Sequence, residues 1–219
     1  ASGHDSLYFQ SLNRNARSMT LDLRHPEGQA ILHRLVQVSD AVFNNLRGDQ
    51  PDVLGLTYDQ LRAHNPRIVC VSLSAFGHVG PWSGRRGFDS LTQNADGIND
   101  AERIAAGEEK PRPLPCQALD HASGYLLAYG AMAALLKRAT EGGSWLVRVS
   151  LAGTGEWIKR LGRVEGGLAV PGLHEAAPYL EESDSGFGRM AAVRHAAILS
   201  ATPAPWALPS MPLGLHPAA

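Results

Sequence analysis

Short apolar runs alternate with helix-like segments through the first half of the chain. Ser18 to Arg24, Asp40 to Asn44 and Arg67 to Ser74 have the alternating or β-branched character of strands. Between them, residues 26–38 have apolar positions at helical spacing, and Tyr58 to His64 predicts a short helix. Strands that alternate with helices form parallel sheets covered by helices. The pattern therefore predicts an α/β fold with a doubly wound, Rossmann-like parallel sheet.

The middle of the chain begins with an irregular, glycine-rich stretch from Gly77 to Gly87. Loops that follow parallel strands are where such folds bind ligands. We expect a helix from Phe88 to Asp96 and an exposed connector in the charged, proline-rich residues 107–115. The next helix, His121 to Lys137, is apolar on nearly every side and is expected to be central. Its close packing would use small residues, namely Gly124, Ala128, Ala131 and Ala134.

The last third predicts a strand at Trp145 to Ser150, a short helix at Glu156 to Arg163 and a strand at Met190 to Leu199. Prolines are frequent from Pro203 to Gly214, and because each removes a backbone donor we expect an extended surface strap there. We therefore expect a nucleotide-fold domain over residues 1–165. Residues 166–219 are expected to be a C-terminal extension that returns to the same domain.

The composition narrows the possible partners. The chain has 219 residues, is 44% hydrophobic and has a formal net charge of −1, so it has no field that would attract nucleic acid or a membrane surface. The longest apolar run, Tyr125 to Leu136, is shorter than the roughly 20 residues of a membrane-spanning helix. The two cysteines, Cys70 and Cys116, favour a reducing cytoplasm over a disulfide framework. None of the nine histidines has metal-ligand spacing, so no metal is expected.

Three segments have more specific sequences: LNRNARSMTLDL at residues 12–23, SLSAFG at residues 72–77 within a longer stretch from Asp40 to Gly97, and LDHASG at residues 119–124. Together they resemble the family III CoA-transferases, the CaiB/BaiF family, which includes formyl-CoA and carnitine CoA-transferases and α-methylacyl-CoA racemases. Their order and spacing match that family over about residues 10 to 165. The resemblance implies the Rossmann-like large domain of these enzymes.

The chain also departs from the family pattern. Family members begin with a strand and an Ala-Gly-Pro turn upstream of the Asn-Arg segment, and no residues here match that start. Residues 165–190 leave no room for the small second domain of the family. We therefore expect a fragment or a shortened member, in which parts of the acyl pocket are missing.

The resemblance implies an acyl-CoA:carboxylate CoA-transferase in which Asp120 forms the covalent intermediate. A carboxylate suits this role because it can form a mixed anhydride and then a thioester. The start of a helix would help, since free backbone amides and the helix dipole stabilise oxyanions. Without the resemblance, Asp120 is more typical of an ordinary helix N-cap than of a catalytic residue. His121 is expected to be structural or solvent-facing, because consecutive helical residues point in different directions.

CoA would be a substrate, not a tightly bound cofactor, and a carboxylic acid would be the acceptor. The positions that the resemblance places near CoA are Leu12, Asn13 and Asn15 at the nucleotide, Asn45, Leu46 and Arg47 along the pantetheine, and Arg86 and Phe88 beyond them. Arg47 and Arg86 can also be solvated surface charges, and Asn45 can cap a turn. Val53 stands where the family has an arginine, so one expected phosphate contact is absent.

Phe88 separates two activities within the family. Racemases use a histidine here, in a Gly-His-Asp context, whereas this chain has Gly87-Phe-Asp89, and phenylalanine cannot exchange a proton. Two alternatives to a transferase remain. One is a catalytically silent half of a duplicated transferase that binds CoA or holds a dimer, and the other is an acyl-CoA racemase or isomerase. The resemblance also implies an interlocked homodimer.

Overall fold

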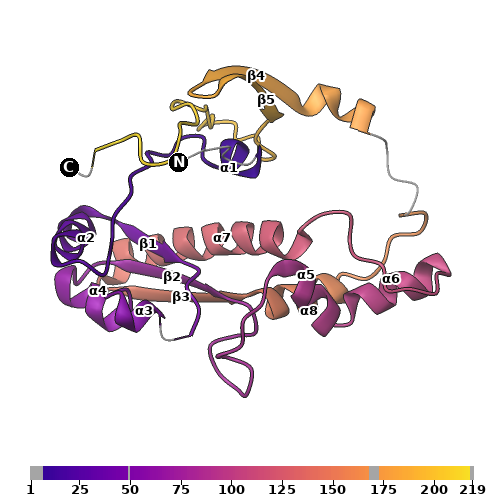
Figure 1. Cartoon of the computed structure of the whole chain (residues 1–219), viewed down its shortest axis with the longest axis horizontal. Coiled ribbons are helices and arrows are strands. Elements are labelled where there is room, and N and C mark those ends of the chain that lie inside the picture. Colours follow the sequence, from indigo (N-terminus) through magenta and orange to yellow (C-terminus); the bar gives the residue numbers. More distant parts are fainter. Residues whose placement is uncertain (1–6, 49, 168–172, 218–219) are drawn as a thin grey trace. The chain divides into compact units, whose positions relative to one another are not determined.

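The computed structural model describes residues 7–48, 50–167 and 173–217. They group into two compact units, Leu23–Leu168 and the paired segments Ala1–Asp22 and Ala169–Ala219. The first 22 residues thus cluster with the C-terminal segment, although the sequence places them with the nucleotide-fold domain. The elements of Figure 1 are α1 (Leu7–Leu12), α2 (Pro26–Val38), β1 (Ala41–Asn44), α3 (Gln50–Val53), α4 (Tyr58–His64), β2 (Val69–Ser74), α5 (Asp89–Ala95), α6 (Ile98–Ala106), α7 (Ala118–Glu141), β3 (Trp145–Ser150), α8 (Leu151–Arg160), the 3₁₀ helix Leu173–Tyr179, β4 (Leu180–Ser185) and β5 (Gly188–Val193).

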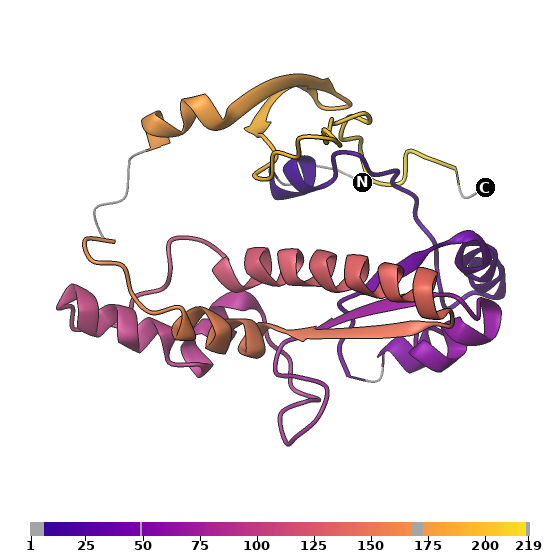
Figure 2. The same ribbon diagram turned by 180° about the vertical axis from the view of Figure 1, so that it is seen from behind.

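The unit Leu23–Leu168 is built on a parallel sheet with the strand order β1-β2-β3. Its central strand is buried on both faces, as parallel strands between helices are. Cys70 packs with α2 and α4 on one face, whereas Val69 and Val71 pack against Ala131 and Ala134 of α7 on the other. Figures 1 and 2 show α7 lying along the sheet on this second face. The predicted parallel α/β fold is confirmed.

One predicted strand, Ser18 to Arg24, is wrong. These residues are neither helix nor strand, and the backbone of Ser18 instead hydrogen-bonds to His216. The amide of His216 donates to the Ser18 carbonyl at 2.9 Å, and Gly214 donates to the Ser18 hydroxyl at 3.0 Å. Alternating apolar residues form a strand only where a neighbouring strand supplies a ladder of partners, and Ser18 instead binds the C-terminal tail.

α7 and α8 differ from their predicted bounds by several residues, and α1, α3 and α6 were not predicted. α7 begins at Ala118 and ends at Glu141, so it is longer at both ends than predicted. α8 begins directly after β3, where the Ser150 hydroxyl caps it by accepting from the Gly153 amide at 3.1 Å. Its glycines lower helix propensity, but a Cβ on Gly155 would lie 2.3 Å from Asp96 Oδ2, so the packing requires glycine there. The short helix α6 was not predicted, because its sequence is polar and has glycine at both ends.

The other unit contains the antiparallel hairpin β4–β5 and the buried residue Arg14. Arg14 pairs with Glu181 at 2.8 Å, donates to the Val193 carbonyl at 2.6 Å and lies over the Trp206 ring. The predicted strand at Met190 to Leu199 is β5, which begins at Gly188 and ends at Val193, and its partner β4 was not predicted. Residues 203–214 form no helix or strand, as predicted for the strap. Among the described residues, none of the helices is both long and apolar enough to cross a membrane.

Candidate active site

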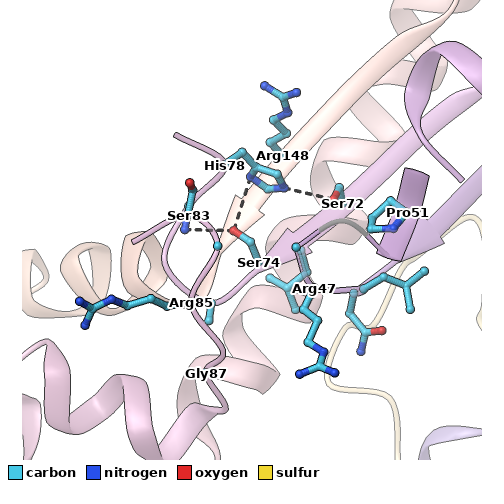
Figure 3. A pocket seen from close by; sticks show the side chains of 16 residues that line it. Arg47, Pro51, Ser72, Ser74, His78, Ser83, Arg85, Gly87 and Arg148 are labelled. Atoms are coloured by element: carbon cyan, nitrogen blue, oxygen red, sulfur yellow. Dashed lines mark hydrogen bonds between the residues drawn. The ribbon is translucent and has the colours of Figure 1, made fainter. Parts of the chain in front are cut away.

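A cavity of about 380 Å³ lies at the carboxyl ends of the three parallel strands. This edge is where open parallel sheets place their ligands. Three segments build the cavity: Asn45 to Gly48 together with Pro51 after β1, residues between Ser72 and Gly87 at and after the end of β2, and Arg148 of β3. Arg148 reaches the same place because the register pairs it with Ser72, which in turn is paired with Asn44. Figure 3 shows these side chains around one hollow.

The loop after β2 is held close to its strand by small residues and by one serine. Ser74 Oγ accepts a hydrogen bond from the Gly77 amide at 3.0 Å, and Gly77 has a φ of 96° that favours glycine. At the other end of the loop, a Cβ on Gly87 would lie 2.6 Å from the Cβ of Ala75. Both glycines therefore allow the chain to fold back and line the cavity.

His78 is fixed in the wall of the cavity by two hydroxyls of β2. Its Nε2 lies 3.1 Å from Ser72 Oγ, and its Nδ1 lies 3.5 Å from Ser74 Oγ. The two serines share a face because strand side chains repeat every second residue. Burial, and then the nearby Arg148 guanidinium, lower the pKa of His78 below its ordinary value. The imidazole is therefore neutral at pH 7.

The cavity has the electrostatic character of an anion site. Arg47, Arg85 and Arg148 line it, and none of the lining side chains within the described residues is an aspartate or glutamate. Arg85 also stacks over the Trp82 ring at 4.6 Å, which restrains its position within the loop. Guanidinium groups without a carboxylate partner suit phosphate or carboxylate groups of a ligand.

Asp120 lies in the first turn of α7, two residues after its first residue, Ala118. It is therefore not the N-cap, which is Gln117, and that side chain makes no capping hydrogen bond. Instead the Asp120 amide donates to Asp89 Oδ2 at 2.9 Å. The amide is thus already bonded to a carboxylate, so a substrate oxyanion could use it only by displacing Asp89.

Asp89 and Gln93 of α5 form a buried polar cluster under the start of α7. The Gln93 side chain donates to Asp89 and to the Cys116 carbonyl, and it accepts from the Leu114 amide at 3.0 Å. These hydrogen bonds join α5 to the connector that precedes α7 and to the first turn of α7. Buried polar groups of this kind specify one geometry when all are satisfied.

The pKa of the Asp120 carboxyl is raised above its ordinary value. Burial is the largest cause, the negative charge of Asp89 raises it further, and His121 acts in the opposite direction. A raised pKa makes the ionised carboxylate more basic and hence a better nucleophile. The neighbouring Ser123 does not face a ligand, because it is fully buried and hydrogen-bonded to Thr154 at 2.7 Å.

The predicted CoA contacts fall into two groups. Asn45, Leu46 and Arg47 line the cavity. Arg86 and Phe88 do not line it, although Gly87, which stands between them in the sequence, does. Leu12, Asn13 and Asn15 belong to the other compact unit, so their contact with CoA stays a prediction. Asn13 donates to the Phe9 carbonyl and Asn15 to the Pro205 carbonyl, each at 3.0 Å.

Several lining residues were missed by sequence reasoning: Ser72, Ser74, His78, Arg85 and Arg148. For Ser72, Ser74 and His78 a signal existed, because they stand at or just after the end of a predicted parallel strand, whereas the positions of Arg85 and Arg148 gave none. Candidate metal ligands do not cluster within the described residues. Burial raises the pKa of the Cys70 thiol to about 11, so this cysteine is neither a nucleophile nor a ready metal ligand.

The sequence profile of CoA-transferase family III matches residues 1–161. Rv1866 of Mycobacterium tuberculosis, a probable CoA-transferase, is 40% identical over 152 residues, which are 66% of this chain and 19% of that protein. The succinyl-CoA–D-citramalate CoA-transferase of Chloroflexus aurantiacus is 33% identical over 148 residues, which are 67% of this chain and 36% of that protein. The matches therefore span well under half the length of these relatives.

Solved structures show the same fold. A crystal structure of Rv3272 from M. tuberculosis has a TM-score of 0.62 at 30% identity and covers 71% of this chain and 44% of that one. A CaiB/BaiF family protein from Brucella suis has a TM-score of 0.65 at 27% identity, covering 84% of this chain and 50% of that one. With the profile match over most of its length, the chain belongs to CoA-transferase family III.

Proposed function

We propose that this chain contains the CoA-binding cavity and the covalent residue of an acyl-CoA:carboxylate CoA-transferase. The observation that supports this most directly is the connection between cavity and carboxylate. The loop after β2 lines the arginine-rich cavity as far as Gly87, and two residues later Asp89 binds the Asp120 amide. One short segment thus links an anion site to the Asp120 carboxylate, whose residue is exposed and whose pKa is raised.

The transfer would proceed through two kinds of covalent adduct on Asp120. The Asp120 carboxylate attacks the thioester carbonyl, the C–S bond breaks, and CoA leaves as a thiolate from an acyl–aspartyl anhydride. The thiolate then attacks the aspartyl carbonyl, which releases the first carboxylic acid and leaves an aspartyl–CoA thioester. The acceptor carboxylate repeats the two steps in reverse order, so that its acyl group leaves on CoA and Asp120 is regenerated.

The cavity would hold the phosphate-bearing part of CoA and the adjoining pantetheine, along which the resemblance places Asn45, Leu46 and Arg47. Arg47, Arg85 and Arg148 supply positive charge, and Asn45 and Leu46 supply polar and apolar contacts beside them. CoA and the acceptor acid are substrates in this proposal, so no tightly bound cofactor is required. Contacts from Leu12, Asn13, Asn15, Arg86 and Phe88 remain part of the proposal.

A racemase is disfavoured by the side chain at position 88. Phe88 is 82% exposed and has no proton to exchange. The catalytically silent half of a duplicated transferase is the second candidate. Such a protein would bind CoA in the same cavity without forming an adduct at Asp120.

The decisive experiment compares the wild-type chain with Asp120→Asn in the presence of acyl-CoA. The wild type is expected to form an adduct on the peptide containing Asp120, detected by mass spectrometry and trapped by hydroxylamine. Asp120→Asn should abolish adduct and transfer but preserve CoA binding, because an amide is a poor nucleophile of the same size. Transfer at the wild-type rate by Asp120→Asn would overturn the mechanism. CoA binding without any adduct on the wild type would favour the silent half.

We also propose an interlocked homodimer in a reducing cytoplasm. The homodimer is supported by an exposed apolar face of α7, formed by Tyr125, Tyr129, Met132 and Leu136. Both cysteines are free, which fits a reducing compartment.

A further inference from the structure

His78 has an unusual hydrogen-bonding environment for a residue in an anion-binding cavity. Both ring nitrogens face serine hydroxyls, Ser72 at Nε2 and Ser74 at Nδ1. A neutral imidazole has one donor and one acceptor nitrogen, whereas an imidazolium has two donors. A hydroxyl can be either donor or acceptor, so this pair of partners is compatible with both protonation states.

The remaining contacts of the two serines allow the charged state without breaking a bond. If His78 is protonated, Ser72 Oγ accepts from Nε2 and turns its own hydrogen toward Asn44 Oδ1, 3.5 Å away. Ser74 Oγ can accept from Nδ1 while it also accepts from the Gly77 amide, because a hydroxyl oxygen has two lone pairs. Its hydrogen is then free to donate to a ligand.

The charges around His78 oppose protonation while the cavity has no anion. Arg148 comes from β3, Arg47 from the segment after β1 and Arg85 from the loop, and all three line the same cavity. The described residues that line it include no carboxylate. Burial and Arg148 accordingly lower the pKa of His78. A bound phosphate reverses the sign of the local field, because an opposite charge favours the imidazolium.

We propose that a phosphate group of CoA binds between Arg148 and His78, and that His78 takes up one proton as the phosphate binds. This inference rests on the proposed function, because it assumes that CoA is the ligand of the cavity. Figure 3 shows Arg148 beside His78, with dashed hydrogen bonds that join His78 to Ser72 and Ser74 of β2. His78 then adds a charged donor to the site only when the phosphate is present.

The coupling has a definite sign. Because binding takes up a proton, the affinity for CoA rises as the pH falls. The rise occurs between the higher pKa of His78 with phosphate bound and its lowered pKa in the free protein. For one proton the rise is at most about tenfold per pH unit. The ligand's own phosphate titrates near pH 6, and its protonation weakens binding. A variant that lacks only the imidazole is therefore needed to separate the two effects.

His78→Gln provides that variant, since an amide also has one donor and one acceptor but does not titrate. We would titrate CoA calorimetrically into wild type and His78→Gln near pH 6.5, in two buffers with different ionisation enthalpies. The dependence of the observed heat on the buffer gives the number of protons taken up. Wild type is expected to take up more protons than His78→Gln, by as much as one, and its affinity should rise more steeply toward low pH.

Two further measurements refine the assignment. Arg148→Gln should weaken CoA binding at least about tenfold and reduce the proton uptake, because His78 is then more protonated before binding. Dephospho-CoA should retain the proton uptake if the diphosphate lies at His78, and lose it if the 3′-phosphate lies there.

Equal proton uptake by wild type and His78→Gln would overturn the inference while leaving the proposed function intact. Failure of CoA to bind the wild type would overturn both.

Discussion

Asp89 acts on Asp120 in two ways, through a hydrogen bond and through its negative charge. Asp89 holds the Asp120 amide and also raises the pKa of the Asp120 carboxyl, after the larger effect of burial. Asp120 must be ionised to attack a thioester, so activity should fall as the pH drops through its pKa. Asp89→Asn keeps an acceptor oxygen but removes the charge. It should lower the pKa of Asp120 and move the acidic limb of the pH–rate profile to lower pH.

The control for that experiment is Asp100→Asn in α6, an exposed aspartate paired with Arg103 and not a contact of Asp120. Its profile should match the wild type. An acidic limb that stays in place in Asp89→Asn would show that the negative charge of Asp89 does not act on Asp120.

Asp96 is a carboxylate whose burial is expected to lower the stability of the folded state at neutral pH. Its Oδ2 is buried without a hydrogen-bond partner, and its pKa is raised from 3.8 to about 6, mainly by burial, with Lys159 opposing and Glu156 adding to the shift. The folded state thus binds this proton more tightly than the unfolded state. Its destabilising effect is complete above pH 6 and disappears as the pH falls toward 3.8.

Asp96→Asn should therefore be more stable than the wild type at pH 8. The difference in unfolding free energy should shrink between pH 6 and pH 4, as measured by urea denaturation at a series of pH values. A difference that is constant with pH would mean that the charge of Asp96 is not the cause.

At the same scale, sequence reasoning found some site residues and missed others for a physical reason. Asn45, Leu46 and Arg47 were found because they follow a predicted strand and match a family motif. Arg148 was missed because an arginine in an alternating strand is typical of a solvent-facing position. Its nearness to Ser72 depends on strand order and register, which arise from pairing between distant segments.

Among the elements, α7 shows what small residues do and do not predict. Ala131 and Ala134 are buried against the sheet, but Gly124 and Ala128 of the same predicted set are exposed. The closest approach is instead at Gly130, where a Cβ would lie 2.5 Å from Val147 Cγ1 of β3. Composition indicated a tightly packed helix, whereas the face that packs is determined by the β-strand beneath it.

The same substitution at two positions of α7 should therefore have opposite effects. Gly130→Ala should cost about 1–3 kcal/mol of unfolding free energy by overpacking against Val147. Gly124→Ala should stabilise by about 0.4–1 kcal/mol, because nothing lies within 4 Å of a Cβ there and alanine restricts the unfolded chain. Denaturant unfolding of the two variants provides the comparison, and equal changes would contradict this packing.

At the scale of the whole molecule, the sequence predicted the parallel sheet correctly, because short apolar runs such as β2 alternate with amphipathic helices such as α2. It did not predict that residues 1–22 group with residues 169–219. That grouping depends on single side chains such as Arg14, which binds Glu181, and Asn15, which exchanges hydrogen bonds with Leu208. Polar contacts across more than 150 positions leave no periodic signal in a sequence.

The exposed face of α7 leads to the last prediction. Tyr125, Tyr129, Met132 and Leu136 repeat every three or four residues, so they form one continuous apolar stripe along the helix. Such a stripe is typical of an interface, and a second copy of the chain is the proposed partner. Met132→Glu should shift the sedimentation of the protein from dimer to monomer, because an unpaired charge at a buried interface is costly. Val38→Glu, which alters an exposed apolar residue at the end of α2, should leave the dimer intact. A wild-type chain that sediments as a folded monomer at high concentration would contradict the homodimer.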